Sequence, residues 1–255
     1  MLLSTFQHIP GVGEKTERGL WKAGCISWDH LLEGDYGLAH ARYLRLKAGI
    51  LESRSRLEIL DHAYFRERLD NGIVWRSYNN FRDHACFLDI ETTGLSPYEG
   101  YVTTVCVHSP KETKTYVAGD NMDELSSDLA QYKYVVTFNG ARFDLPFLSA
   151  NLGLSFDQIH LDLLYPLRTL GYRGGLKKIE GELGISRDTL GVTGFDAVRL
   201  WHAYKNERTV EVAGQKVRGL DALDLLVRYN REDATNLERL ADYAVIELRK
   251  KCFAP

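Results

Sequence analysis

The stretch FLDIETTGL, residues 87–95, places two carboxylates inside an otherwise apolar segment. Because residues two apart on a β-strand point to the same face, Asp89 and Glu91 are expected to lie side by side. Two neighbouring carboxylates on a buried strand repel each other and lose hydration, so a divalent cation is the natural compensating partner. The pattern leaves one alternative open, an edge strand on which Leu88 and Ile90 face the core while the two carboxylates face water.

A second acidic segment follows at VVTFNGARFDLPFL, residues 135–148. Here a strand runs into Asn139-Gly140, and Asp144 begins the next helix at the edge of a sheet, where α/β proteins place their ligands. Asp144 is also a good helix N-cap, and that alternative stays open.

The third acidic segment is YNREDATNL, residues 229–237. Tyr229 and Asp233 are four residues apart, so they are neighbours on one face of the expected helix. A solvated helix face is the alternative, because other charged side chains surround both residues.

The order of the predicted elements from Ala85 onward indicates an α/β domain with helices packed on a mixed β-sheet. The first three strands are close in sequence, so antiparallel pairing is expected among them. The expected strands are residues 85–90, 101–109, 113–119 and 133–139, and the expected helices are residues 121–132, 144–153, 175–185 and 222–251.

The composition bounds the class of protein. The chain has 255 residues, 44% hydrophobic and 26% charged, which suits one large globular domain or one domain with a small appendage. No apolar run approaches the roughly 20 residues of a membrane helix, and polar residues interrupt the start too early for a signal peptide. The four cysteines have no C-x-x-C spacing, so we expect reduced thiols and a cytoplasmic location. The net charge of −3 argues against indiscriminate binding of polyanions.

The three acidic segments together resemble the three exonuclease motifs of the DEDD exonuclease superfamily, which has a ribonuclease H-like fold. DIETTGL resembles the first motif, FNGARFD the second as found in family B DNA polymerase proofreading domains, and YNRED the third in the Tyr-x-x-x-Asp version of the DEDDy branch. The resemblance spans about residues 84–250. It implies that the metal ligands are Asp89, Glu91, Asp144 and Asp233, and that Tyr229 orients the attacking water.

Other polar and basic residues near these motifs are candidates for substrate contacts. The residues expected to bind substrate are Thr92, Asn139, Phe143 and Lys177, although Asn139 could equally cap the turn. Basic side chains between the second and third motifs could neutralise phosphates or lie on a solvated helix surface: Arg168, Arg173, Lys177 and Lys178. Asp162 and His160 could support the site or make structural hydrogen bonds, and Trp201 is expected in the core.

The segment HIPGVGEKTERGLWKAG, residues 8–24, resembles a helix-hairpin-helix motif. Its glycines permit a tight turn whose N–H groups point outward at a helix start, where phosphate binds without base contacts. The residues expected to contact the DNA backbone are Gly11, Val12, Gly13, Lys15 and Thr16, with Arg18 and Lys22 as further candidates. Glu14 and Glu17 lie close to the hairpin and are expected to oppose phosphate. A protein-docking module and a purely structural helical hairpin remain alternatives.

The expected organisation is a helix-hairpin-helix region over residues 1–34, a helical linker over 35–83 and a ribonuclease H-like domain over 84–255. The resemblance implies a 3′→5′ exonuclease that hydrolyses nucleic acid with two Mg²⁺ or Mn²⁺ ions. DNA, in single strands, is favoured over RNA because the hairpin approaches backbone phosphates. No membrane partner is expected. A structure-specific endonuclease and a nucleic-acid-binding adaptor with a silent core are the alternatives.

Overall fold

The computed structural model describes residues 1–253. The helices before the first strand are η1 (Leu2–Ser4), α1 (Glu14–Lys22), α2 (Trp28–Glu33), α3 (His40–Glu58), α4 (His62–Arg66), η2 (Val74–Ser77), α5 (Tyr78–Phe81) and η3 (Arg82–His84), where η marks a 3-10 helix. The central part contains β1 (Ala85–Thr92), β2 (Val102–His108), β3 (Thr113–Val117), η4 (Met122–Glu124), α6 (Leu125–Leu129), β4 (Tyr134–Thr137), α7 (Asp144–Leu152) and β5 (Ile159–Asp162). The last part contains α8 (Leu164–Leu170), α9 (Leu176–Glu182), α10 (Gly194–Lys205), β6 (Thr209–Val212), β7 (Gln215–Arg218) and α11 (Leu220–Cys252).

The main sheet has five strands in the order β3-β2-β1-β4-β5. The β1–β2 and β2–β3 pairs are antiparallel, whereas β4 pairs in parallel with both β1 and β5. The predicted mixed sheet flanked by helices is therefore confirmed, and each predicted strand overlaps an observed one. Strand β1 is the middle strand, which excludes the edge-strand alternative. Only its first residues, 85–87, pair with β4, so its carboxyl-terminal half runs beyond β4.

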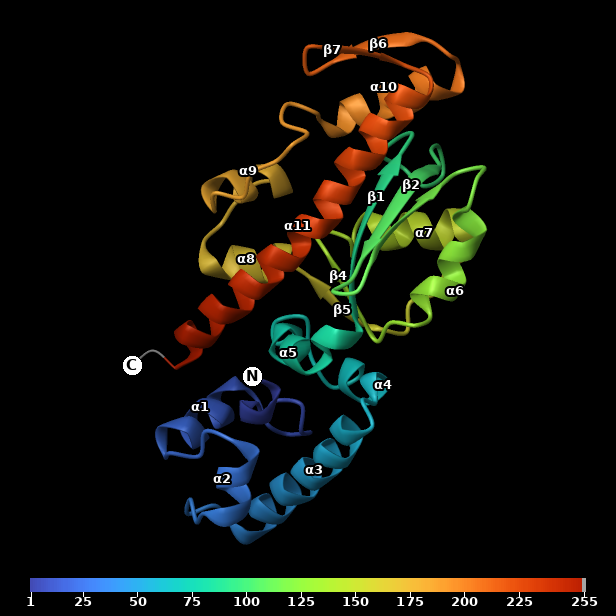
Figure 1. The fold of residues 1–255 in the computed structure, drawn as a ribbon. Coiled ribbons are helices and arrows are strands. Elements are labelled where there is room, and N and C mark those ends of the chain that lie inside the picture. Colours follow the sequence, from blue (N-terminus) through green and yellow to red (C-terminus); the bar gives the residue numbers. More distant parts are fainter. Residues whose placement is uncertain (254–255) are drawn as a thin grey trace.

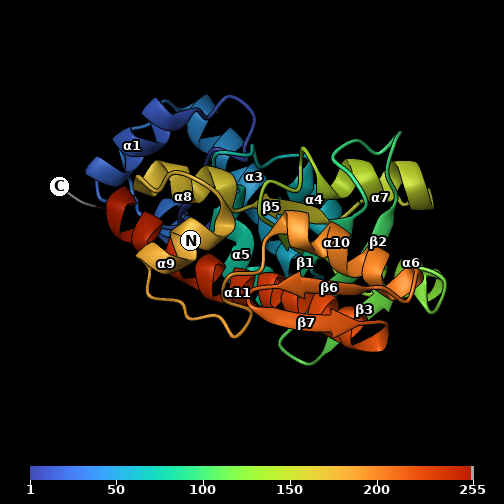
Figure 2. The ribbon, with the colours of Figure 1, turned by 90° about the horizontal axis from the view of Figure 1, so that it is seen from above.

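Helices cover both faces of this sheet (Figures 1 and 2). On one face, Leu88 and Ile90 of β1 pack against α6 and α7, which contribute Leu125 and Phe147 among others. On the opposite face, strand side chains such as Phe87 pack against α8 and α11. The alternation of side chains along β1 therefore sends the apolar residues at positions 88 and 90 to one side and the carboxylates at 89 and 91 to the other.

Helix α11 organises the whole molecule. It has 33 residues, which corresponds to a length of about 50 Å. An apolar stripe of this helix is buried against the sheet: Leu237, Leu240, Ala241, Ala244 and Leu248. Near its start, α11 packs on α10, where Trp201 is buried as expected, and on the β6–β7 hairpin, which the sequence pattern did not predict. Its far end reaches the N-terminal helices, where the Trp21 and Phe253 rings lie 5.1 Å apart.

The N-terminal helices form the opposite end of the molecule from the β6–β7 hairpin (Figure 1). The predicted helical linker over residues 35–83 contains the helices α3 and α4. Residues 73–83 form short helical turns that bury Trp75 and Phe81. Apolar side chains of this region belong to the same hydrophobic cluster as Phe87 of the sheet, so one core joins the N-terminal helices to the sheet.

Two further expectations concern local structure and thiols. The helix predicted over residues 121–132 is shorter, because the Asn121 side chain bonds back to the main chain of β3 and a 3-10 turn precedes α6. All four cysteines are free thiols, as expected. Within residues 1–253, no helix combines the length and the apolar character needed to cross a bilayer.

Candidate active site

Three carboxylates meet where α11 crosses the carboxyl-terminal half of β1. Oxygen atoms of Asp89, Glu91 and Asp233 all lie within 4.8 Å of one another. The Asn230 side chain donates hydrogen bonds to the Asp89 carboxylate (2.7 Å) and to the Asp89 main-chain carbonyl (3.0 Å), so α11 fixes the orientation of this carboxylate. The two strand carboxylates thus face α11, and Asp233 is buried in the same place.

The fourth predicted carboxylate lines the same cavity. Asp144 is buried at the first turn of α7, while the N-cap position belongs to Phe143 and no side chain caps the helix. The capping alternative for Asp144 is therefore wrong. The cavity has a volume of about 360 Å³, and its lining residues include Asp89, Glu91, Phe138, Asn139, Phe143, Asp144, Leu176, Lys177, Lys178, Tyr229 and Asp233.

The turn before α7 is held by Asp162 of β5. The main-chain N–H groups of Asn139 and Ala141 donate to the two Asp162 carboxylate oxygens, at 2.7 and 3.2 Å. Asn139 adopts a left-handed conformation with φ of 62°, and a Cβ on Gly140 would lie 2.3 Å from Thr137 Oγ1. Asp162 thus makes structural hydrogen bonds, which is one of the two roles predicted for it. Position 140 requires glycine because Thr137 leaves no room for a Cβ.

Tyr229 and Lys177 form a contact at the edge of the carboxylates. Tyr229 is only 3% exposed, which excludes the solvated helix face, and its hydroxyl oxygen accepts a hydrogen bond from the Lys177 ammonium. The same ammonium donates to the Val192 carbonyl at 2.9 Å. Burial and the neighbouring carboxylates raise the pKa of the Tyr229 hydroxyl, and burial lowers the pKa of Lys177. The phenol is therefore a neutral hydroxyl here.

The electrostatics of the cavity favour a cation. Burial, followed by repulsion from the neighbouring carboxylates, raises the pKa of Asp89 well above its usual value, and burial does the same for Glu91. Burial raises the pKa of Asp144 to about 7 and that of Asp233 to about 6. Carboxylates that are this costly to ionise together, and that offer only oxygen donors, fit a hard divalent cation such as Mg²⁺ or Mn²⁺.

Sequence reasoning missed two residues that hold these carboxylates in place. The buried Arg187 guanidinium donates to Glu180 and to Asp233, both at 2.5 Å. Asn230 supports Asp89 from the helix turn that carries Tyr229. Asn230 was visible inside the third motif, whereas nothing in the local pattern around Arg187 distinguishes it from a surface residue.

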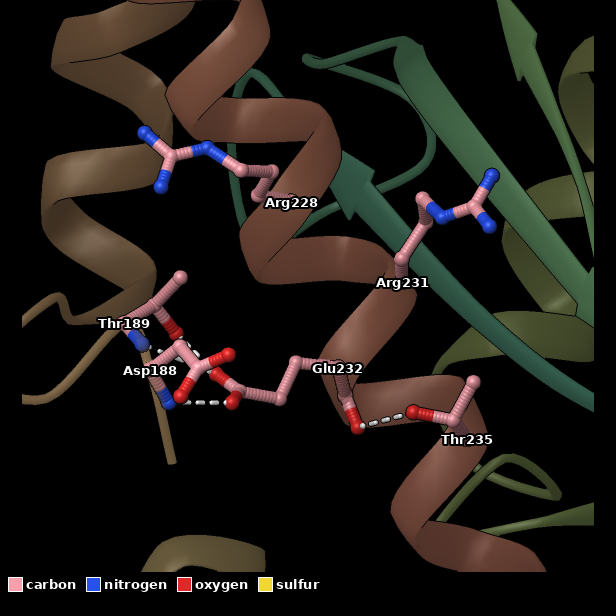
Figure 3. Close-up of a pocket in the computed structure, with 6 residues that line it drawn as sticks. All are labelled: Asp188, Thr189, Arg228, Arg231, Glu232 and Thr235. Atoms are coloured by element: carbon pink, nitrogen blue, oxygen red, sulfur yellow. Dashed lines mark hydrogen bonds between the residues drawn. The ribbon is translucent and has the colours of Figure 1, made fainter. Parts of the chain in front are cut away.

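A second cavity of about 270 Å³ lies on the outer side of α11 (Figure 3). At its centre, the Glu232 carboxylate accepts hydrogen bonds from the main-chain N–H groups of Asp188 and Thr189 and from the Thr189 hydroxyl. Arg228 and Arg231 point away from this carboxylate. None of the predicted catalytic residues lines this cavity. The hydrogen bonds of Glu232 attach the loop that carries Arg187 to α11, and they thereby help to hold Arg187 beside Asp233.

Two predicted or considered residues do not line the main cavity. Thr92 is buried, and its hydroxyl donates to the Gly94 carbonyl at 2.6 Å. His160 bonds through its ring to the Thr137 hydroxyl at 2.9 Å. The Thr92 bond therefore stabilises a local turn and the His160 bond joins strands β4 and β5, while Asn139, Phe143 and Lys177 do line the cavity.

The hairpin residues lie at the start of α1, outside the cavity. They comprise Gly11, Val12, Gly13, Lys15 and Thr16, of which Val12 is buried and both glycines and Lys15 are exposed. Gly11 has a φ of +83°, and a Cβ there would approach the Arg45 guanidinium to 3.3 Å. Arg42, also from α3, donates to the Thr16 hydroxyl at 2.9 Å. Helix α3 thus adds two arginines beside the hairpin.

One expectation about this hairpin is wrong. Glu17 does not oppose phosphate, because it is fully buried and paired with Arg76 at 2.7 Å. It also accepts hydrogen bonds from the Thr5 hydroxyl and the Phe6 main-chain N–H. The sequence pattern could not show this partner, which lies 59 residues away.

Comparison with protein families found one match. The family described as the RNase_H superfamily matches residues 86–245, which include all four carboxylates and Tyr229. A search of curated proteins found no match.

Several solved structures resemble this fold. The family B DNA polymerase from the hyperthermophilic archaeon Pyrobaculum calidifontis has a TM-score of 0.46 and 14% identity, over 63% of this chain and 25% of the polymerase. NrnC of Brucella melitensis bound to pGG has a TM-score of 0.41 and 23% identity, over 68% of this chain and 76% of NrnC. NrnC with bound Mg²⁺ has a TM-score of 0.40 and 24% identity, over 68% and 77%. The chain thus spans about a quarter of the polymerase.

Proposed function

The chain belongs to the RNase_H superfamily and has its nuclease fold, and from that premise we propose that it is a metal-dependent 3′→5′ exonuclease. Its proposed substrate is single-stranded nucleic acid, with DNA preferred over RNA. The observation that carries the proposal is the meeting of Asp89, Glu91 and Asp233 within 4.8 Å, in a cavity that Asp144 also lines.

The proposed ligands of two Mg²⁺ or Mn²⁺ ions are Asp89, Glu91, Asp144 and Asp233. When bound, such ions lower the pKa of water and stabilise the leaving oxygen of a phosphodiester. The arrangement of donors supports this assignment, because all are carboxylates and all face one cavity. Asn230 and Arg187 keep Asp89 and Asp233 in position through the hydrogen bonds described above. We propose that Tyr229 and Asp233 act as the Tyr-x-x-x-Asp pair of the DEDDy branch.

The proposed role of Tyr229 is to orient the attacking water. The Lys177 ammonium donates to the phenolic oxygen, which leaves the phenolic proton available to a second acceptor. A neutral phenol is a hydrogen-bond donor rather than a general base, in agreement with the direction of its pKa. Lys177 lines the cavity as well, so its positive charge is available to a substrate phosphate.

The proposed contacts to the terminal nucleotide come from Asn139 and Phe143. Both line the cavity beside Asp144, and the Asp162 hydrogen bonds fix the turn on which they lie. A cavity of about 360 Å³ suits a single terminal nucleotide, in agreement with the proposed single-stranded substrate.

The hairpin at the start of α1 is proposed to bind backbone phosphates. Its exposed glycines and Lys15 lie near Arg42 and Arg45. The expected opposition from Glu14 stands, because Glu14 is exposed and, within residues 1–253, pairs only with Arg18. The burial of Glu17 removes one negative charge from this surface. The preference for DNA rests on this hairpin.

The proposal is tested with 5′-end-labelled single-stranded DNA and RNA of equal sequence, in Mn²⁺, Mg²⁺ or EDTA. The wild-type protein is compared with Asp89→Ala and with the exposed control Asp120→Ala. A descending ladder that requires metal and Asp89, and that the control retains, supports a 3′→5′ exonuclease. Faster decay of DNA than of RNA supports the sugar preference.

Two outcomes would overturn the proposal. Cleavage of a closed circular single strand, which has no end, would identify an endonuclease. Tight binding without hydrolysis of any strand would identify an adaptor with a silent core.

A further inference from the structure

A basic segment of the chain lies between the cavity and the N-terminal helices. Residues 163–179 contain four basic residues and no acidic one. Arg168 and Arg173 are exposed, and Arg173 donates only to main-chain carbonyls. Lys177 lies at the cavity end of this segment. Among residues 1–253, neither arginine has a carboxylate within ion-pair distance, so the charges of Arg168 and Arg173 are not neutralised locally.

This surface continues across the end of α11 to α1. The Lys251 ammonium donates to the Thr169 carbonyl at 2.9 Å, which places the end of α11 against α8. The contact between the Trp21 and Phe253 rings then places α1 beside the end of α11. Lys22, the next residue along α1, is exposed. Figure 1 shows α9, α8, the end of α11 and α1 following one another along one side of the molecule, and in Figure 2 all four gather on one side.

We call this surface the basic track, defined by Lys177, Arg173, Arg168, Lys251 and Lys22. Its length follows from α11, which runs alongside it. Asp233 and Lys251 are 18 residues apart on one helix, or about 27 Å at ~1.5 Å per residue. Phosphates of a stacked strand are ~3.4 Å apart, so this distance corresponds to about eight nucleotides.

We propose that the basic track binds the phosphate backbone of a single strand whose 3′ end lies in the cavity. The preferred substrates are then strands of about eight nucleotides or more, rather than di- and trinucleotides. This inference rests on the proposed function. A nucleic acid strand fits better than an acidic protein segment, because the track leads at Lys177 into the carboxylate cavity where the strand is proposed to be cleaved. Its positive charges suit phosphates, and contacts of this kind do not depend on the base sequence.

The first test measures KM and kcat for single strands from about three to about twenty nucleotides, a range that brackets the length of the track. KM should fall with length up to about eight nucleotides and then level off, while kcat stays constant, because only strands of about that length reach all five basic residues of the track. A KM that is already constant from trinucleotides upward would overturn the track.

The second test compares Arg168→Ala/Arg173→Ala with the matched control Arg208→Ala/Lys216→Ala. The control residues are exposed, lack ion pairs within residues 1–253, and lie near the β6–β7 hairpin at the other end of the molecule. The track variant should raise KM severalfold for long strands and leave it unchanged for trinucleotides. Its log KM against log salt should lose about 1.4 of slope, at ~0.7 per lost phosphate contact. Equal effects of the two double variants would refute the assignment.

A binding measurement separates failure of the track from failure of the proposed function. Fluorescence anisotropy of labelled strands with Asp89→Ala in EDTA reports the track without hydrolysis. Length-dependent binding without any hydrolysis by the wild type would overturn the nuclease and keep the track. Hydrolysis that does not depend on strand length would overturn the track and keep the nuclease. Displacement of the strand by a polyglutamate peptide as readily as by unlabelled DNA would identify the track as a docking surface for acidic proteins.

Discussion

Asp89→Asn should stabilise the metal-free protein while it abolishes hydrolysis. The substitution removes one negative charge from the cluster with Glu91 and Asp233 but keeps the size of the side chain. It also keeps an oxygen that accepts the hydrogen bond from Asn230, which Asp89 now receives at 2.7 Å. Repulsion is therefore relieved without a cavity or a lost partner, and a proposed metal ligand is weakened at the same time.

The magnitude follows from the distances. Unit charges 4.8 Å apart repel by about 3.5 kcal/mol at an effective dielectric constant of ~20. Asp89 faces two such neighbours, but the raised pKa values of the cluster mean that part of this repulsion is already relieved by protonation. A gain of about 2 kcal/mol is expected, which raises the melting temperature by roughly 4–8 °C for a chain of this size.

Thermal unfolding in EDTA and in excess Mn²⁺ measures both effects. Wild-type protein should melt higher in Mn²⁺, whereas Asp89→Asn should respond much less, because ligand binding to the folded state raises its stability. The control Asp120→Asn, at an exposed position, should change stability by less than about 0.5 kcal/mol. Reasoning from charge repulsion is refuted if Asp89→Asn melts below the wild type in EDTA, or if Mn²⁺ raises both melting temperatures equally.

The pH dependence supplies a second check on the same variant. Asp144 and Asp233 have folded-state pKa values raised to about 7 and about 6. Groups with raised pKa values bind protons more readily in the folded state, so in EDTA their contribution to stability is lost as pH rises toward 7. The stability advantage of Asp89→Asn should therefore be larger at pH 8 than at pH 5.

Three other substitutions test neighbouring features. Arg187→Lys keeps the charge but loses the forked guanidinium that reaches Glu180 and Asp233 together. The free energy of unfolding should fall by about 2 kcal/mol, and the turnover number should fall as well. An unchanged turnover number would show that Arg187 does not position Asp233. Gly140→Ala places a Cβ 2.3 Å from Thr137 Oγ1, so activity should fall at least tenfold, and Gly140→Ala/Thr137→Ala should recover part of it. Burial lowers the pKa of His8 to about 4. Between about pH 6.5 and pH 4 the unfolded state then binds more protons than the folded state. The free energy of unfolding, measured with urea, should therefore fall by up to ~3 kcal/mol as the pH is lowered through that range, and it should fall less in His8→Gln.

The sequence determined the elements whose signals are local. Side chains alternate along a strand, which places Asp89 and Glu91 on one face. Residues four apart on a helix are neighbours, which places Tyr229 beside Asp233. Asp144 lies at the start of a helix that follows a strand. Those regularities depend on backbone geometry within a few residues. They were sufficient to predict the mixed sheet and the long terminal helix, whereas the prediction that the four carboxylates form one site came from the resemblance of the three motifs to a known family.

The tertiary structure alone decided which distant groups meet. Asn230 lies 141 residues from Asp89, and Arg76 lies 59 residues from Glu17, yet each pair is in hydrogen-bond contact. The path of α11 across β1, and from the cavity to the N-terminal helices, depends on which apolar faces pack together. A pattern of apolar residues shows that a face is buried but not which face covers it. The sign and strength of each charge depend on desolvation and partners, and these exist only after the chain has packed.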